Sequence, residues 1–94
     1  MKEPLDERTR VTISPSVYAR AFGEEVVLLE FGKGEYFGLD AVGAVVWRRL
    51  EEGDDLGMAA DHLVAEYDVS REEALGDILA LVAELRKHEL LVAA

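Results

Sequence analysis

The spacing of the apolar residues changes at Asp40, and this change limits the fold more than any other property of the chain. Between Val11 and Leu39 the apolar residues are branched or aromatic and follow one another closely, as in VVLLEF at 26–31, which is typical of β-strands. After Asp40 they recur at intervals of three or four residues, the period of one helix face. Strands followed by helices predict an α+β domain in which helices cover one face of a small antiparallel sheet.

The N-terminal half contains four short apolar segments that predict strands. Gly23 and Glu24 suit a tight two-residue turn with glycine first, and the stretch from Gly32 to Gly34 suits a slightly longer hairpin. These hairpins predict a three-stranded antiparallel meander. The four apolar segments are 11–13, 18–22, 26–31 and 35–39.

The C-terminal half predicts three helices. Asp40 can cap the first, which is expected to end near Gly53, and either Asp54 or Asp55 can cap the second. The loops between the helices are too short to be domain linkers.

The last helix has the strongest local signature, because Ser70 is followed three residues later by Glu73, the spacing of a capping box. It is predicted to run from Arg71 to about His88. Its apolar residues form two adjacent stripes, so its hydrophobic arc is wider than one neighbouring element needs. The first stripe contains residues 74, 78, 81 and 85, and the second, which needs a further partner, contains residues 75, 79 and 82.

The size of the chain predicts one domain. With 94 residues, half of them hydrophobic, two separate cores would each bury too little surface. The first ten residues, MKEPLDERTR, are charged and are predicted to be a flexible tail, so the folded domain spans 11–92. Because the start is not apolar and no stretch is long enough to span a bilayer, a cytoplasmic location is expected.

The charge of the chain bears on its partners. Twenty acidic and ten basic side chains give a formal net charge of -10, which repels the phosphate backbone of nucleic acid and disfavours binding to an anionic membrane. The chain has no cysteine, so disulfides and thiolate metal sites are excluded.

No group of residues predicts catalysis, a metal site or a cofactor. His62 and His88 fit no metal-ligand spacing, and no serine lies in a nucleophile elbow or beside a candidate base. Trp47 is interpreted as a core residue with its ring nitrogen at the surface. These observations favour a non-catalytic binding domain.

The strand 35–39 and the last helix are predicted to form a binding groove. If this strand is an edge of the sheet and borders the helix, its unpaired backbone groups and the second stripe of the helix make two walls that fit an extended peptide. A basic residue near the groove can orient the ligand. The predicted peptide contacts are Glu35, Tyr36, Phe37, Gly38 and Leu39 in the strand, and Leu75, Leu79, Val82 and Arg86 in the helix.

Three segments together resemble the PqqD-like family. They are the opening strands ISPSVYARAFGEEVVLLEFGKG at 13–34, the strand and helix YFGLDAVGAVVW at 36–47, and the last helix DILALVAELRKHELLV at 77–92. The order and spacing of the three carry the match. The short form with tryptophan in the first helix is most similar to the discrete recognition proteins of lasso-peptide biosynthesis. The chain departs from the family pattern at Asp40, Val42 and Glu89, where asparagine, threonine and glycine are common.

The resemblance implies a winged-helix-like fold of three strands and three helices. It also implies that the domain binds the leader segment of a ribosomally made precursor peptide as an added strand against 35–39, with the last helix opposite. The bound leader is then presented to a processing enzyme, which for lasso peptides is a leader peptidase and an ATP-dependent cyclase. No chemistry is implied for the chain itself. Glycine often ends the last helix in the family, and a non-glycine residue in a left-handed cap costs about 1 kcal/mol.

Three other functions stay open at this stage. A winged-helix DNA-binding module shares the order of elements, but its recognition helix should be basic, whereas this one carries Glu72, Glu73, Asp77 and Glu84. A small domain that dimerises through the same groove is compatible with the composition. A peptide-responsive enzyme is the weakest alternative, because no catalytic constellation is present.

Overall fold

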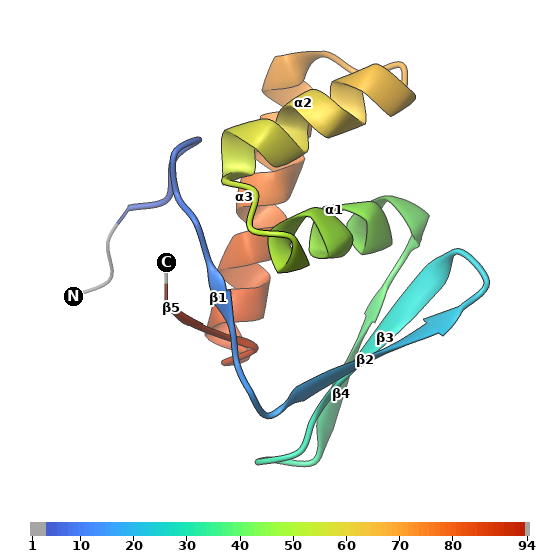
Figure 1. Ribbon diagram of the computed structural model, residues 1–94, viewed down its shortest axis with the longest axis vertical. Helices are drawn as coiled ribbons and strands as arrows, with labels where there is room; N and C mark the ends of the chain where they lie inside the picture. The colour runs from blue at the N-terminus through green and yellow to red at the C-terminus, as the bar shows by residue number, and fades with distance from the viewer. Residues whose placement is uncertain (1–3, 94) are drawn as a thin grey trace.

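The computed structural model describes residues 4–93, in which a three-stranded sheet and three helices share one hydrophobic core (Figure 1). This arrangement confirms the predicted α+β, winged-helix-like fold. The elements are β1 (Thr12–Ile13), β2 (Val17–Phe22), β3 (Glu25–Glu30), β4 (Glu35–Leu39), α1 (Ala41–Glu51), α2 (Leu56–Glu66), α3 (Arg71–Lys87) and β5 (Leu91–Ala93).

The sheet is an antiparallel meander with the strand order β2-β3-β4. Gly23 and Gly34 have backbone angles φ of 63° and 71°, in the left-handed region that glycine adopts without strain. Both predicted turns are therefore confirmed. Among residues 4–93, β3 is the one strand that pairs with β4, so β4 has an open edge.

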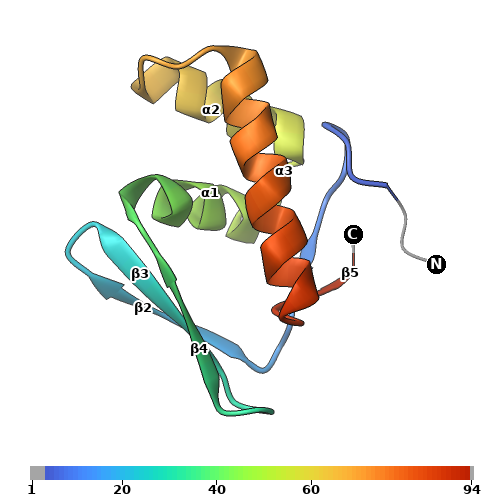
Figure 2. The same cartoon turned by 180° about the vertical axis from the view of Figure 1, so that it is seen from behind.

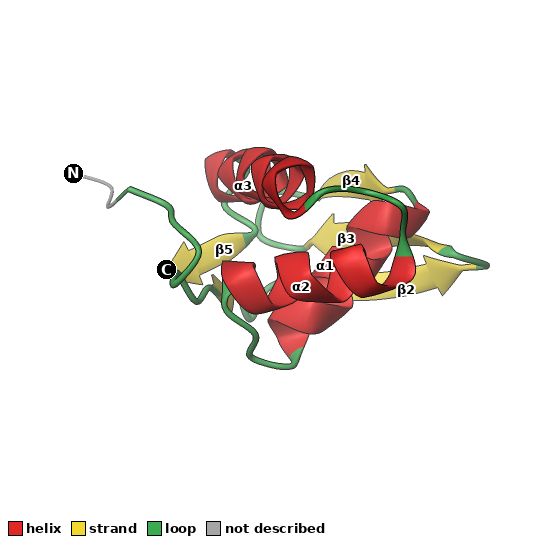
Figure 3. Cartoon of the chain, turned by 90° about the horizontal axis from the view of Figure 1, so that it is seen from above, coloured by secondary structure: helices red, strands yellow, loops and turns green. Residues whose placement is uncertain are grey.

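One face of the sheet is buried against the helices. Val26 and Leu28 of β3 are 4 % and 0 % exposed, and α1 packs over β3 and β4. From behind, α3 descends beside β4 (Figure 2), and from above these two elements lie on the same side of the molecule (Figure 3). The packing thus brings the open edge of the sheet next to the last helix.

The helix caps lie where the sequence predicts them. The carboxylates of Asp40 and Asp55 each accept a hydrogen bond from the backbone N–H three residues later, and Ser70 with Glu73 forms the full capping box. The helix α3 ends before Glu89, whose φ of 61° is left-handed. The chain therefore adopts the left-handed cap even though glycine is absent at this position.

A second, two-stranded sheet was not predicted. The strand β5 follows α3 and pairs antiparallel with β1, with Ile13 opposite Leu91. Ser14 also donates its backbone N–H to the carbonyl of Leu90 at 3.0 Å. Strands of two or three residues are too short to show an alternating pattern, which is why the sequence indicated β1 only as an apolar segment and gave no sign of β5.

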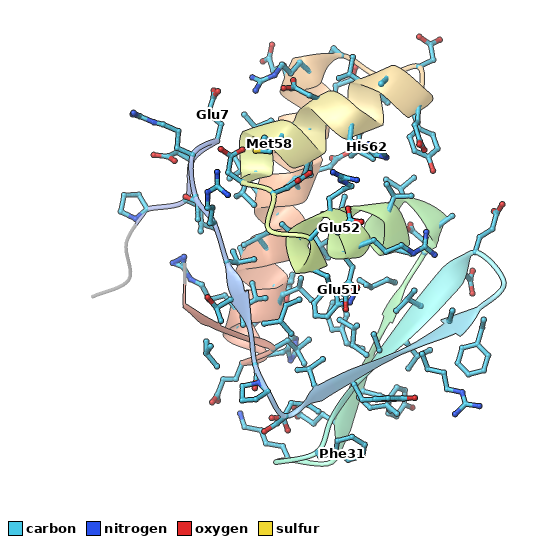
Figure 4. The ribbon with its side chains drawn as sticks, in the orientation of Figure 1. Glu7, Phe31, Glu51, Glu52, Met58 and His62 are labelled. Carbon is cyan, nitrogen blue, oxygen red and sulfur yellow. The ribbon has the colours of Figure 1, made fainter. Side chains whose placement is uncertain are left out.

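The segment expected to be a tail has hydrogen-bonding partners on α2. The carbonyls of Thr9 and Glu7 accept from the backbone N–H groups of Leu56 and Gly57 at 3.0 and 2.7 Å. A Cβ atom at Gly57 would lie 3.0 Å from the Glu7 carbonyl oxygen, so this close approach depends on glycine. Figure 4 shows Glu7 beside the start of α2. Residues 1–3 of the predicted tail lie outside the described residues.

The core contains Trp47, which is 1 % exposed. Its ring nitrogen Nε1 is buried and has no hydrogen-bonding partner among the described residues. The core position is as predicted, but the interpretation that the ring nitrogen reaches the surface is wrong, because α1 directs the whole indole into the interior. No helix within residues 4–93 is both long enough and apolar enough to cross a bilayer.

Candidate peptide-binding site

The hydrogen-bonding pattern of β3 shows which backbone groups face each neighbouring strand. The two-residue turn makes Phe22 and Glu25 the closing pair of the β2–β3 hairpin, and such a pair exchanges both of its hydrogen bonds. Glu25, Val27 and Leu29 of β3 therefore direct their backbone N–H and C=O groups toward β2. The backbone N–H of Phe31 donates to the carbonyl of Ser16 at 3.0 Å, which agrees with this phase.

The same alternation leaves two residues of β4 with free backbone groups. Because the odd-numbered residues of β3 face β2, Leu28 faces β4 and exchanges its hydrogen bonds with Phe37, its partner in the register. The residues on either side, Tyr36 and Gly38, therefore direct their N–H and C=O groups to the open edge. Four backbone groups are available there for an added strand.

Two hollows flank this edge on the face turned toward the helices. The first has a volume of about 310 Å³ and is lined by Gly34, Glu35, Tyr36, Phe37, His88 and Leu90. The second has a volume of about 420 Å³, and its walls include Leu39, Val42, Leu63, Asp77, Ile78 and Leu81. Phe37 lines both hollows and separates them. Together they make a largely apolar groove between β4 and α3.

Contacts between the β3–β4 turn and the end of α3 lie next to the first hollow. The ring of His88 packs against that of Phe37, with centroids 5.5 Å apart. The Lys33 ammonium forms an ion pair with the Glu89 carboxylate, and this hydrogen bond raises the pKa of Lys33 above its ordinary value. The Glu30 carboxylate, 8 % exposed as a residue, accepts from the backbone N–H of Lys33 at 2.8 Å and shapes the turn.

The charges along the groove are mostly negative. Glu35 lines the first hollow, and Asp40 and Asp77 line the second. The Asp40 carboxylate is already engaged as the cap of α1, at 2.8 Å from the Gly43 nitrogen. Glu35 and Asp77 are both exposed. A ligand with neutral or basic side chains near these two carboxylates suits the site better than an acidic one.

All five strand residues predicted from the sequence line the hollows. Glu35, Tyr36 and Phe37 lie at the first, and Phe37, Gly38 and Leu39 lie at the second. The structure brings them together as the β4 wall of the groove.

The four predicted helix residues lie elsewhere on α3. Val82 is 0 % exposed and belongs to the core. Leu75, Leu79 and Arg86 are not among the residues that line the two hollows. A helix turns by about 100° per residue, so Leu79 and Arg86 face almost opposite to Asp77. Their role as peptide contacts stays a prediction.

The helix wall of the groove is formed instead by Asp77, Ile78, Leu81 and His88. Ile78 and Leu81 belong to the first apolar stripe of α3, and not to the second stripe that the sequence predicted as the peptide wall. Both stripes are equally regular in the sequence, so periodicity shows that α3 has two apolar sides but not which side meets β4. His88 contributes to this wall because it lies directly after the last residue of α3.

Comparison with known proteins gives a consistent result. Residues 25–91 match the family described as coenzyme PQQ synthesis protein D (PqqD). This range extends from β3 to β5 and includes both walls of the groove. No curated protein matches the sequence.

Two solved structures are similar over almost the whole chain. A structure described as TbiB1 in complex with the TbiA(beta) leader peptide is 40% identical, and the match covers 88% of this chain and 96% of that one with a TM-score of 0.84. A structure described as lasso peptide synthetase B1 complexed with the leader peptide is 30% identical, over 89% of this chain and 99% of that one, with a TM-score of 0.83. Both similar proteins were solved with a leader peptide bound.

Proposed function

This chain belongs to the PqqD family, and from that premise we propose that it binds the leader segment of a ribosomally made precursor peptide as a strand added to β4. The observation that carries the proposal is the open edge at Tyr36 and Gly38, beside two apolar hollows. The leader peptides bound to the two similar proteins support the choice of ligand.

In this mechanism the backbone of the leader pairs with Tyr36 and Gly38, and these bonds set the direction of the peptide. Alternate side chains of an added strand point to the same face, so every second leader residue points toward the helices. The leader residue opposite Leu39 reaches the second hollow, and the leader residue opposite Glu35 reaches the first. A disordered leader loses chain entropy on binding, so a few buried apolar anchors are expected to supply most of the affinity.

The proposed role is that of a non-catalytic adaptor. The bound leader is presented to a processing enzyme, and the similarity to a lasso peptide synthetase B1 favours a leader peptidase, with a cyclase, in lasso-peptide biosynthesis. The protein supplies the strand edge and the groove, and the partner enzyme supplies the chemistry. The cytoplasmic location inferred from the sequence stays a prediction.

A proline at Gly38 tests the strand-addition mechanism. The N–H of Gly38 faces the open edge, so Gly38→Pro removes a donor for the peptide and leaves the β3–β4 hydrogen bonds in place. The matched control is Gly38→Ala, which keeps the N–H, and its methyl group would meet no heavy atom within 4 Å. Thermal unfolding of each variant checks the fold.

The ligand for this test is a pool of peptides selected on the wild-type protein from a random 20-residue display library, together with the TbiA(beta) leader peptide. We expect Gly38→Pro to weaken the selected peptides by tenfold or more and Gly38→Ala by less than threefold, as orders of magnitude for a lost backbone hydrogen bond. Backbone amide signals of Tyr36 and Gly38 should shift on binding. Selection of no peptide, or undiminished binding to a folded Gly38→Pro variant, would contradict the proposal.

A further inference from the structure

An ion pair beside the first hollow connects its two walls. The pair is formed by the Lys33 ammonium and the Glu89 carboxylate, which lie 56 positions apart in the chain. Lys33 directly precedes Gly34, where the β4 wall begins, and Glu89 lies between His88 and Leu90, which line the opposite wall. The ion pair therefore links the sheet to the end of α3 where the groove separates them.

The β3–β4 turn fixes the position of the lysine. The Glu30 carboxylate accepts from the backbone N–H of Lys33 at 2.8 Å, and the Glu30 carbonyl accepts from the N–H of Gly34 at 2.9 Å. A Cβ atom at Gly32 would lie 3.1 Å from the Glu30 carboxylate oxygens, so the turn closes tightly around this side chain. The lysine thus projects from a well-defined turn.

The backbone after α3 fixes the position of the glutamate. The N–H of Glu89 donates to the Arg86 carbonyl at 3.1 Å, and the N–H of Leu90 donates to the Leu85 carbonyl at 2.9 Å. Glu89 has a φ of 61°, a conformation that glycine adopts with less strain. The carboxylate is therefore carried at a position where a side chain costs some folding stability.

We propose that the Lys33–Glu89 pair is a latch that holds β4 and the end of α3 at the spacing in which a peptide side chain fills the first hollow. The inference rests on the proposed strand addition to β4. If the latch opens, the two walls can separate, and a side chain in the hollow loses contact on one side. The affinity then depends on the fraction of the protein that is latched. Lys33 and Glu89 are positioning residues in this mechanism, and neither needs to touch the peptide.

The strength of the latch is limited by its exposure. The Lys33 and Glu89 side chains are 48% and 67% exposed, and an ion pair of this kind changes an equilibrium by a factor of about two to five. The hydrogen bond with Glu89 raises the pKa of Lys33 most, and the charges of Glu35 and Glu30 also raise it. Because both partners are exposed, dissolved salt should weaken the latch.

A double-mutant cycle on the two partners tests the latch. Lys33→Met and Glu89→Gln each remove one charge and keep a side chain of similar length. Each should weaken the display-selected peptides by about two- to fivefold. The double variant should bind no more weakly than the weaker single variant, because either change breaks the same pair. Glu7→Gln is the control, since it breaks an ion pair of similar exposure with Arg71 on the α2–α3 side, and it should leave the affinity unchanged.

Two further readouts separate the latch from a role in folding alone. Glu89→Gly removes the carboxylate and relieves the left-handed strain, so it should melt no lower than the wild type and yet bind the peptides as weakly as Glu89→Gln. Raising the salt concentration from about 0.05 to about 0.5 M should weaken peptide binding more for the wild type than for the double variant. A role in folding alone predicts neither result.

The outcomes distinguish this inference from the proposed function. If peptides shift the amides of Tyr36 and Gly38 but bind the Lys33 and Glu89 variants as tightly as the wild type, the latch is wrong and strand addition stands. The same conclusion follows if the losses of the two single variants add up in the double variant, because the two side chains then act independently. If no peptide engages the β4 edge, both inferences fail.

Discussion

The ring of Phe37 packs against the ring of His88, with centroids 5.5 Å apart and planes tilted by 55°. This contact joins the open strand β4 to the end of α3 in the wall of the first hollow, and Phe37 also lines the second. The groove is therefore divided by one aromatic side chain, and its two halves receive different residues of a bound strand.

Phe37→Ala should weaken binding of the selected peptides by about tenfold or more, because it removes the shared wall of both hollows. Phe31→Ala is the control. Phe31 is 70 % exposed and lies at the β3–β4 turn (Figure 4), outside both hollows. Isothermal titration calorimetry measures the affinities. Equal losses in the two variants would show that the groove does not hold the peptide.

Leu81→Ala and Leu79→Ala compare the two sides of α3. Both leucines are half-buried against the core, so both variants should lose about 2 kcal/mol of unfolding free energy. Leu81 lines the second hollow, so its loss should also weaken peptide binding by severalfold, and loss of Leu79 should not. Chemical denaturation and peptide titration measure the two effects. If Leu79→Ala weakens peptide binding and Leu81→Ala does not, the second stripe of α3 is the peptide wall, as predicted from the sequence.

Removal of residues 1–10 tests whether this segment is a tail. Truncation deletes the Glu7 and Thr9 carbonyls that accept from Gly57 and Leu56, and it should lower the unfolding free energy by about 2 kcal/mol at about 1 kcal/mol for each hydrogen bond. Glu7→Ala, which keeps the carbonyl and removes an exposed ion pair with Arg71, should change it by less than about 0.5 kcal/mol. An unchanged denaturation midpoint for the truncated protein would support a tail.

Asp54→Asn should destabilise the turn between α1 and α2. The Asp54 side chain is 7% exposed, its carboxylate lies 2.8 Å from the Arg49 Nε, and this hydrogen bond raises the pKa of Arg49. Loss of the charge should cost about 1–2 kcal/mol. The other carboxylate paired with Arg49 belongs to Glu52, whose side chain is 62% exposed. Glu52→Gln removes this pair and should cost less than about 0.5 kcal/mol. Equal shifts in melting temperature would show that burial of Asp54 is immaterial.

Much of the fold could be predicted because its signals are local. Asp40 and the pair Ser70 and Glu73 cap helices through hydrogen bonds to residues three positions away, and Gly23 allows a turn by its own backbone freedom. The β4 wall of the candidate site was predicted for the same reason, since a short aromatic strand after a glycine turn is visible in the sequence itself.

The helix wall could not be predicted in the same way. Leu79 and Leu81 are both apolar residues at helical spacing, and only the docking of α3 places Leu81 at the second hollow.

The sequence by itself determined the order of the elements from β1 to α3, with their caps and turns, because these depend on interactions within a few residues. Only the tertiary structure decided which face of α3 lines the groove, that β5 pairs with β1, and that Glu7 approaches Gly57. These contacts join residues far apart in the chain, and their free energy depends on how whole surfaces fit together, which no local spacing encodes.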